Sequence, residues 1–84
     1  MHHITIHAAI EHSIEQYYLM LENEGETVTG LYNLIINEAE QAVISNVMKR
    51  CRYNQSHAAK TLGITRNTLK KKLDQHRIPY PKQR

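Results

Sequence analysis

The sequence lacks several features that stabilise or export short chains. It contains a single cysteine, Cys51, so no internal disulfide can form, and this favours a reducing, cytoplasmic location. No stretch approaches the roughly 18 apolar residues that cross a bilayer, and the first residues do not resemble a signal peptide. With 84 residues, the chain is expected to form one domain with a marginal core. Additional stability is therefore expected from association with a second chain.

Positive charge is absent from the first 48 residues. Residues 1–48 contain seven glutamates and no lysine or arginine, whereas residues 49–84 contain all eleven basic residues and one acid, Asp74. The two parts carry formal charges of −7 and +10, within a net charge of +3. A solvated charged surface usually mixes both signs, so this separation indicates that the C-terminal part binds a polyanion.

Patterns typical of catalysis and metal binding are also missing. His2, His3 and His7 lie near the start of the chain, without acidic or thiolate partners at the fixed spacing that a zinc site needs. His12 is similarly isolated, and the expected role of Cys51 is that of a small packed hydrophobic residue. No phosphate-binding loop and no nucleophile–base pair is evident. We expect no enzyme activity, no cofactor and no metal site.

Apolar residues recur at helical spacing through the N-terminal half. The pattern predicts a short arm over residues 1–6, a helix from about His7 to Glu22, and a longer helix from about Gly30 to Arg50. The longer helix carries two apolar stripes. The first contains Leu31, Leu34, Ile35, Ala39, Ala42, Val43 and Val47, and the second contains Ile36, Ile44 and Met48.

So wide an apolar surface cannot be covered by a two-helix hairpin. It is predicted to be buried in a homodimer, with an interface formed by Leu31, Leu34, Ile35, Ile36, Ala39, Ala42, Val43 and Val47. The alternative is that both stripes pack within one chain.

Residues 54–75 carry the most specific pattern, that of a helix-turn-helix. Asn54 can cap a short helix over Gln55–Leu62, Gly63 supplies a sharp turn, and Thr65 can cap a second helix from Arg66 to about Gln75. The residues expected to point inward are Ala58, Ala59, Leu62, Ile64, Leu69 and Leu73. Because Leu69 and Leu73 belong to this core, no apolar face remains for a membrane surface.

The second helix would expose a basic surface suited to double-stranded DNA. Its exposed residues are expected to be Arg66, Asn67, Thr68, Lys70, Lys71 and Lys72. Recognition helices place their N-terminal residues at base edges, where Arg66 can donate two parallel hydrogen bonds to guanine. The short polar groups of Thr65, Asn67 and Thr68 suit bases or phosphates, and the lysines suit phosphates. The alternative is a solvated lysine-rich helix without a ligand.

The ends of the helix-turn-helix extend this surface. Asn54, Gln55 and Ser56 offer side chains and backbone N–H groups to a phosphate. Pro79 and Pro81 stop the last helix, and Lys82 and Arg84 can reach flanking phosphates. Within one domain over residues 1–84, the dimerisation helices are expected over residues 7–52, the helix-turn-helix over 53–78 and a basic tail over 79–84.

These motifs resemble the Fis family (factor for inversion stimulation), bacterial nucleoid-associated proteins that bend DNA. The matching segments are EAEQ at Glu38–Gln41, NQSHAAKTLGI at Asn54–Ile64 and RNTLKKKL at Arg66–Leu73. The resemblance covers more than half the chain closely and the first helix loosely. It implies an all-α protomer of four helices, whose two N-terminal helices intertwine with those of a partner in a homodimer.

The resemblance also implies roles for individual residues. Arg66 would read a guanine near each end of the DNA site. The DNA backbone would be held by Asn54, Ser56, Thr68 and Lys71, and flanking DNA by Lys70 and Lys72. The implied function is that of a sequence-tolerant DNA-binding and DNA-bending transcription regulator of the nucleoid.

Departures from the family pattern modify these expectations. Because the arm before the first helix is short, we do not expect recombinase activation. Thr65 stands where the family often has asparagine, and Tyr53 replaces a glycine. Asp74 and Gln75 replace lysines, which should weaken flanking contacts.

Two other functions remain open at this point. Asn67 is frequent in the C-terminal domains of NtrC-like regulators, so the chain could be a detached domain of that type. Its start at Met1, without a receiver or ATPase domain, leads us to expect a stand-alone protein. The other alternative is a protein-interaction module, in which the acidic half recruits a partner.

Overall fold

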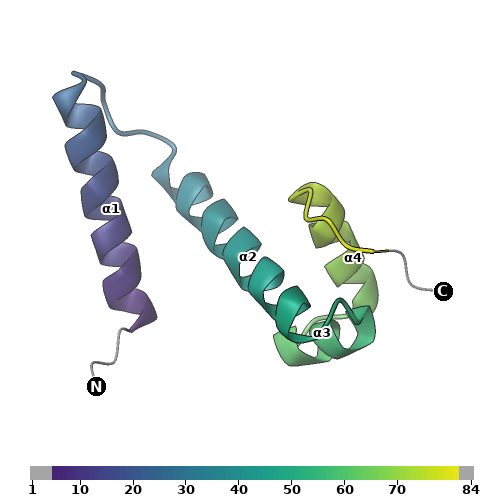
Figure 1. Ribbon diagram of the computed structural model, residues 1–84. Coiled ribbons are helices and arrows are strands. Elements are labelled where there is room, and N and C mark those ends of the chain that lie inside the picture. The colour runs from purple at the N-terminus through teal and green to yellow at the C-terminus, as the bar shows by residue number, and fades with distance from the viewer. Residues whose placement is uncertain (1–4, 82–84) are drawn as a thin grey trace. The chain divides into compact units, whose positions relative to one another are not determined.

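The computed structural model describes residues 5–81, and within this range it contains four α-helices and no strand (Figure 1). The helices are α1 (Ile6–Asn23), α2 (Leu31–Arg50), α3 (Gln55–Leu62) and α4 (Arg66–Gln75). The predicted all-α class is confirmed. The described part of the chain divides into an N-terminal unit, up to residue 37, and a C-terminal unit, from residue 38 onward. Helix α2 begins in the first unit and ends in the second.

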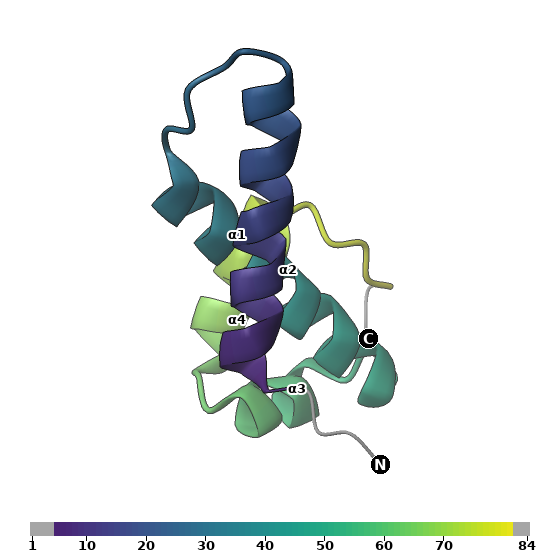
Figure 2. The same ribbon diagram turned by 90° about the vertical axis from the view of Figure 1, so that its left-hand side faces the viewer.

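In the N-terminal unit, α1 begins one residue earlier than expected. The Thr5 hydroxyl oxygen accepts the Ala8 N–H at 3.0 Å, so Thr5 caps the helix and Ile6 belongs to it rather than to an arm. The rest of the predicted arm, residues 1–4, lies outside the described residues. No residue of α1 is buried, and the connection over residues 24–30 has no regular structure (Figure 2).

The C-terminal unit contains the buried core. Its members come from α2, α3, α4 and the segment after α4, and they are Ile44, Met48, Ala58, Ala59, Leu69, Leu73 and Ile78. The inward positions predicted at Ala58, Ala59, Leu69 and Leu73 are confirmed, and Leu62 and Ile64 are partly buried against them.

Part of the second apolar stripe of α2 is covered within the chain. Ile44 and Met48 are 3% and 0% exposed, and both belong to the core that α3 and α4 complete. Neither residue belongs to the predicted dimer interface, and a single chain covers both. Ile36, on the same stripe, remains 47% exposed.

The three helices of the C-terminal unit end in the same way, with a Schellman motif. In each, a backbone N–H donates to the carbonyl oxygen five residues earlier: Tyr53 to Met48 at 2.8 Å, Ile64 to Ala59 at 3.0 Å, and Ile78 to Leu73 at 2.9 Å. The residue before each donor has a left-handed φ, which is 53° at Arg52, 75° at Gly63 and 53° at Arg77. The last motif brings Ile78 back onto the core, since Ile78 is 7% exposed. Lys82 and Arg84, predicted to reach flanking phosphates, lie outside the described residues.

Candidate nucleic-acid interface

Both helices of the helix-turn-helix begin at the caps that the sequence predicts, Asn54 before α3 and Thr65 before α4. Asn54 Oδ1 accepts the His57 N–H at 3.0 Å, and Thr65 Oγ1 accepts the Thr68 N–H at 3.1 Å. The Thr65 hydroxyl also donates to Thr68 Oγ1 at 2.8 Å. Between the two helices, Gly63 adopts a left-handed φ of 75°. These contacts set the point at which α4 begins and hence where its first side chains project.

The first turns of α4 present a basic surface. Arg66, Asn67, Lys70 and Lys71 are exposed, and Thr68 is half-buried. Because residues four apart share a helix face, Arg66 lies one turn from Lys70 on one face, and Asn67 lies one turn from Lys71 on another. Within residues 5–81, no ion pair engages Arg66, Lys70 or Lys71. These cations are therefore available to an external anion.

Two residues predicted for this surface are placed differently. Gln55 is 8% exposed and lies among the buried residues of the C-terminal unit, whereas its neighbours Asn54 and Ser56 are exposed. The Lys72 ammonium nitrogen lies 2.9 Å from Glu40 Oε2, and its side chain is 33% exposed. The structure therefore does not bring Gln55 and Lys72 together with the exposed residues of α4.

Glu40 and His76 form a contact that the sequence did not reveal. The Nε2 atom of His76 lies 2.6 Å from Glu40 Oε1, and the two side chains are 7% and 28% exposed. The hydrogen bond with His76, followed by that with Lys72, holds the pKa of the Glu40 carboxyl below its usual value. One carboxylate on α2 thus holds two basic side chains of α4. Glu40 and His76 are 36 positions apart in the sequence, so no local spacing could have indicated this contact.

The residues predicted for the dimer interface leave apolar surface uncovered. Leu34, Ile36 and Val43 are 38%, 47% and 52% exposed. The other predicted interface positions, Leu31, Ile35, Ala39, Ala42 and Val47, are half-buried or exposed, and none is buried. These three side chains of α2 are open to contact with another molecule.

The N-terminal unit also has hollows that open to solvent. An apolar hollow of about 190 Å³ lies between Ile14 of α1 and the first turns of α2, where it is lined by Leu31, Tyr32, Ile35 and Ile36.

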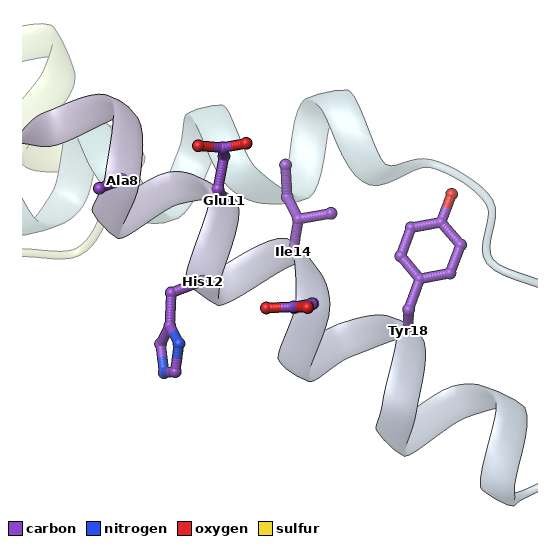
Figure 3. A pocket seen from close by; sticks show the side chains of 6 residues that line it. Ala8, Glu11, His12, Ile14 and Tyr18 are labelled. Atoms are coloured by element: carbon purple, nitrogen blue, oxygen red, sulfur yellow. The ribbon is translucent and has the colours of Figure 1, made fainter.

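A second hollow is lined by α1 alone, and Figure 3 shows Glu11, His12, Ile14 and Tyr18 projecting from that one helix. Within the described residues, this hollow has no opposing wall.

The described residues contain no group of three or more histidine, cysteine, aspartate or glutamate side chains placed to hold a metal ion. None of the helices over residues 5–81 has both the length and the apolar character needed to span a membrane.

Comparison with known proteins identifies the family. A family model described as "Bacterial regulatory protein, Fis family" matches residues 35–76, which is half of the chain. The chain belongs to the Fis family. The match covers most of α2 and all of α3 and α4, so the same segment of the Fis-family protein carries the basic surface and the buried core except Ile78.

Curated relatives agree with this membership. The chain is 40% identical over 67 residues to "DNA-binding protein Fis" of Buchnera aphidicola, which covers 80% of this chain and 67% of that protein. It is 41% identical over 71 residues to a "Putative Fis-like DNA-binding protein" of Ralstonia nicotianae, covering 84% and 90% of the two chains. A Pseudomonas aeruginosa protein with the same description is 36% identical over 72 residues, covering 86% and 67%. These similarities favour the Fis family over the NtrC-like alternative.

Proposed function

We propose that this Fis-family protein is a homodimer that binds and bends double-stranded DNA and acts as a nucleoid-associated transcription regulator in the cytoplasm. The observation that carries the proposal is the exposed basic surface of α4, placed directly after a capped helix-turn-helix. The proposed activity is binding, without catalysis. The curated relatives described as DNA-binding proteins support it.

The proposed contacts follow from position and exposure. Arg66, the first residue of α4, is placed to donate two hydrogen bonds to a guanine edge, a contact worth roughly 1–3 kcal/mol of discrimination. Thr65, Asn67 and Thr68 surround it and would contact bases or nearby phosphates. Phosphates of the site and its flanks would be held by Asn54, Ser56, Lys70 and Lys71, all of which are exposed. Gln55 is left out of this set because it is buried.

The proposed dimer explains the uncovered N-terminal unit. In proteins most of the stability of a helix comes from packing, and α1, with 18 residues, has no buried residue in the single chain. A second copy would supply the missing cover for α1 and for the apolar residues of α2. It would also present two copies of α4 to one duplex. Bending of that duplex is expected to be least costly where its centre is A·T-rich.

Fluorescence anisotropy at several salt concentrations tests this function. One duplex carries guanines near both ends of a site of about one and a half helical turns with an A·T-rich centre, and the other is scrambled. A dimer that neutralises about eight phosphates should give a log–log salt slope near −7, with preference for the designed duplex. The matched control is the triple variant Arg66→Gln, Lys70→Gln, Lys71→Gln, which should bind weakly with a shallow slope. A flat slope for the natural protein would refute the proposal.

A further inference from the structure

Three consecutive lysines, at positions 70–72, occupy the middle of α4. Successive residues of an α-helix are separated by about 100° around its axis, so three in a row cannot share one direction. Lys70 and Lys71 are exposed, whereas the side chain of Lys72 is 33% exposed and turned toward α2. In the unbound protein, Lys72 is therefore less exposed to solvent than Lys70 and Lys71.

Both oxygens of the Glu40 carboxylate are engaged on this side of α4. Oε2 lies 2.9 Å from the Lys72 ammonium and Oε1 lies 2.6 Å from Nε2 of His76. Lys72 and His76 are four residues apart, so they lie on one face of α4, one turn from each other. Since the His76 side chain is only 7% exposed, the contact anchors the last turn of α4 against α2 at a largely buried point.

A DNA phosphate would have to compete with Glu40 for Lys72. Release of the lysine would leave the carboxylate partly buried with one partner lost, which is unfavourable for a desolvated charge. A phosphate drawn close to Lys72 would also approach the negative charge of Glu40. Lys70 and Lys71 carry neither penalty, because no ion pair engages them within the described residues.

We propose that Glu40 is a positioning residue of the DNA-binding surface, which withholds Lys72 from DNA and leaves Lys70 and Lys71 as the phosphate contacts of α4. This inference rests on the proposed function, and it differs from the flanking-DNA role that the family resemblance implies for Lys72. Its consequence is that the number of phosphates neutralised by α4 is set partly by an acidic residue on another helix.

The salt dependence of DNA binding distinguishes free from withheld lysines. Each phosphate contact contributes about 0.9 to the magnitude of the log–log slope, or about 1.8 for the two copies in a dimer. Lys71→Gln should make the slope shallower by about 1.8. Lys72→Gln should change it by much less. Glu40→Gln should make it steeper, by up to about 1.8, because the freed Lys72 gains a phosphate.

A double variant shows whether Lys72 causes the effect of Glu40. Glu40→Gln combined with Lys72→Gln should return the slope to that of the natural protein. Glu24→Gln, which removes the same charge from an exposed side chain far along the sequence from α4, controls for the overall change in electrostatics and should leave the slope unchanged. Circular dichroism establishes that each variant is folded.

The outcomes separate this inference from the proposed function. If the natural protein binds DNA with a steep slope but Lys72→Gln weakens the slope as much as Lys71→Gln, Lys72 is an ordinary phosphate contact and the inference is overturned. Equal steepening by Glu24→Gln and Glu40→Gln would also overturn it. Should Glu40→Gln fail to fold, the comparison of Lys72→Gln with Lys71→Gln still decides. A natural protein without salt-dependent binding would instead refute the proposed function.

Discussion

Replacing Arg77 with glycine is expected to stabilise the protein, although it removes a basic residue from the end of α4. Arg77 has a φ of 53°, a left-handed conformation that costs a residue with a Cβ atom about 1–2 kcal/mol. Glycine avoids this cost but loses about 0.5–1 kcal/mol more conformational entropy on folding. Because Arg77 is exposed, little packing is lost with its side chain. The difference predicts a gain of about 0.5–1 kcal/mol.

The equivalent position after α3 gives the opposite prediction. Gly63 has a φ of 75°, and a Cβ atom added there would meet no heavy atom within 4 Å. Gly63→Ala therefore introduces backbone strain without a steric clash, and we expect a loss of about 0.5–1 kcal/mol. The two substitutions should change stability by similar amounts in opposite directions.

Thermal unfolding followed by circular dichroism measures both effects. Protein concentration must be held constant, because the stability of a dimer depends on it. A change of 1 kcal/mol corresponds to roughly 4–8 °C in Tm for a domain of this size. Arg77→Ala is the matched control, since it removes the charge but keeps the left-handed strain, and it should leave stability nearly unchanged. Destabilisation by Arg77→Gly, or a neutral Gly63→Ala, would show that this strain does not govern the helix ends.

Three further predictions address the DNA contact, the core and the ion pair. Arg66→Ala should reduce the preference for the guanine-bearing duplex by roughly 5- to 150-fold, whereas Lys71→Ala should weaken binding to matched and scrambled duplexes alike; competition anisotropy compares them, and equal losses of preference would contradict the base contact. Leu69→Ala, at a position that is 0% exposed, should cost about 2–5 kcal/mol in urea unfolding, and a loss below 1 kcal/mol would mean that the core collapses around the cavity. Because the pKa of Glu40 is lowered from 4.5 in the folded state, its contribution to stability is present above about pH 4.5 and is lost as the pH falls through the lowered value. Glu40→Gln should therefore flatten the loss of stability below pH 4.5, and an unchanged pH profile would count against the ion pair.

The helix-turn-helix could be predicted because its determinants are local. The side chains of Asn54 and Thr65 each bond an N–H three residues ahead, and Gly63 supplies the conformation of the turn within the same segment. Such contacts depend on neighbouring residues only, so the sequence shows them directly. The inward positions of Leu69 and Leu73 could be predicted for the same reason, because they follow from helical periodicity.

The remaining features depend on packing between distant segments. Lys72 follows two exposed lysines, and the local pattern gave no sign that Glu40 engages it, 32 residues earlier in the chain. Gln55 is the first residue of α3, where a polar side chain is expected to be exposed, but it is buried. Ile44 and Met48 belong to an apolar stripe when α2 is considered alone, and only the positions of α3 and α4 show that one chain covers them.

The absence of any buried residue in α1 has a consequence for how the protein responds to its own abundance. In the proposed homodimer, α1 gains its packing only when two chains meet, so ordering of the N-terminal unit and assembly are a single equilibrium. At protein levels below the dimer dissociation constant, the concentration of dimers rises with the square of the chain concentration. Occupancy of a DNA site by dimers would then rise about fourfold when synthesis of the protein doubles. In the proposed homodimer, the uncovered helix would make the regulator respond steeply to changes in expression.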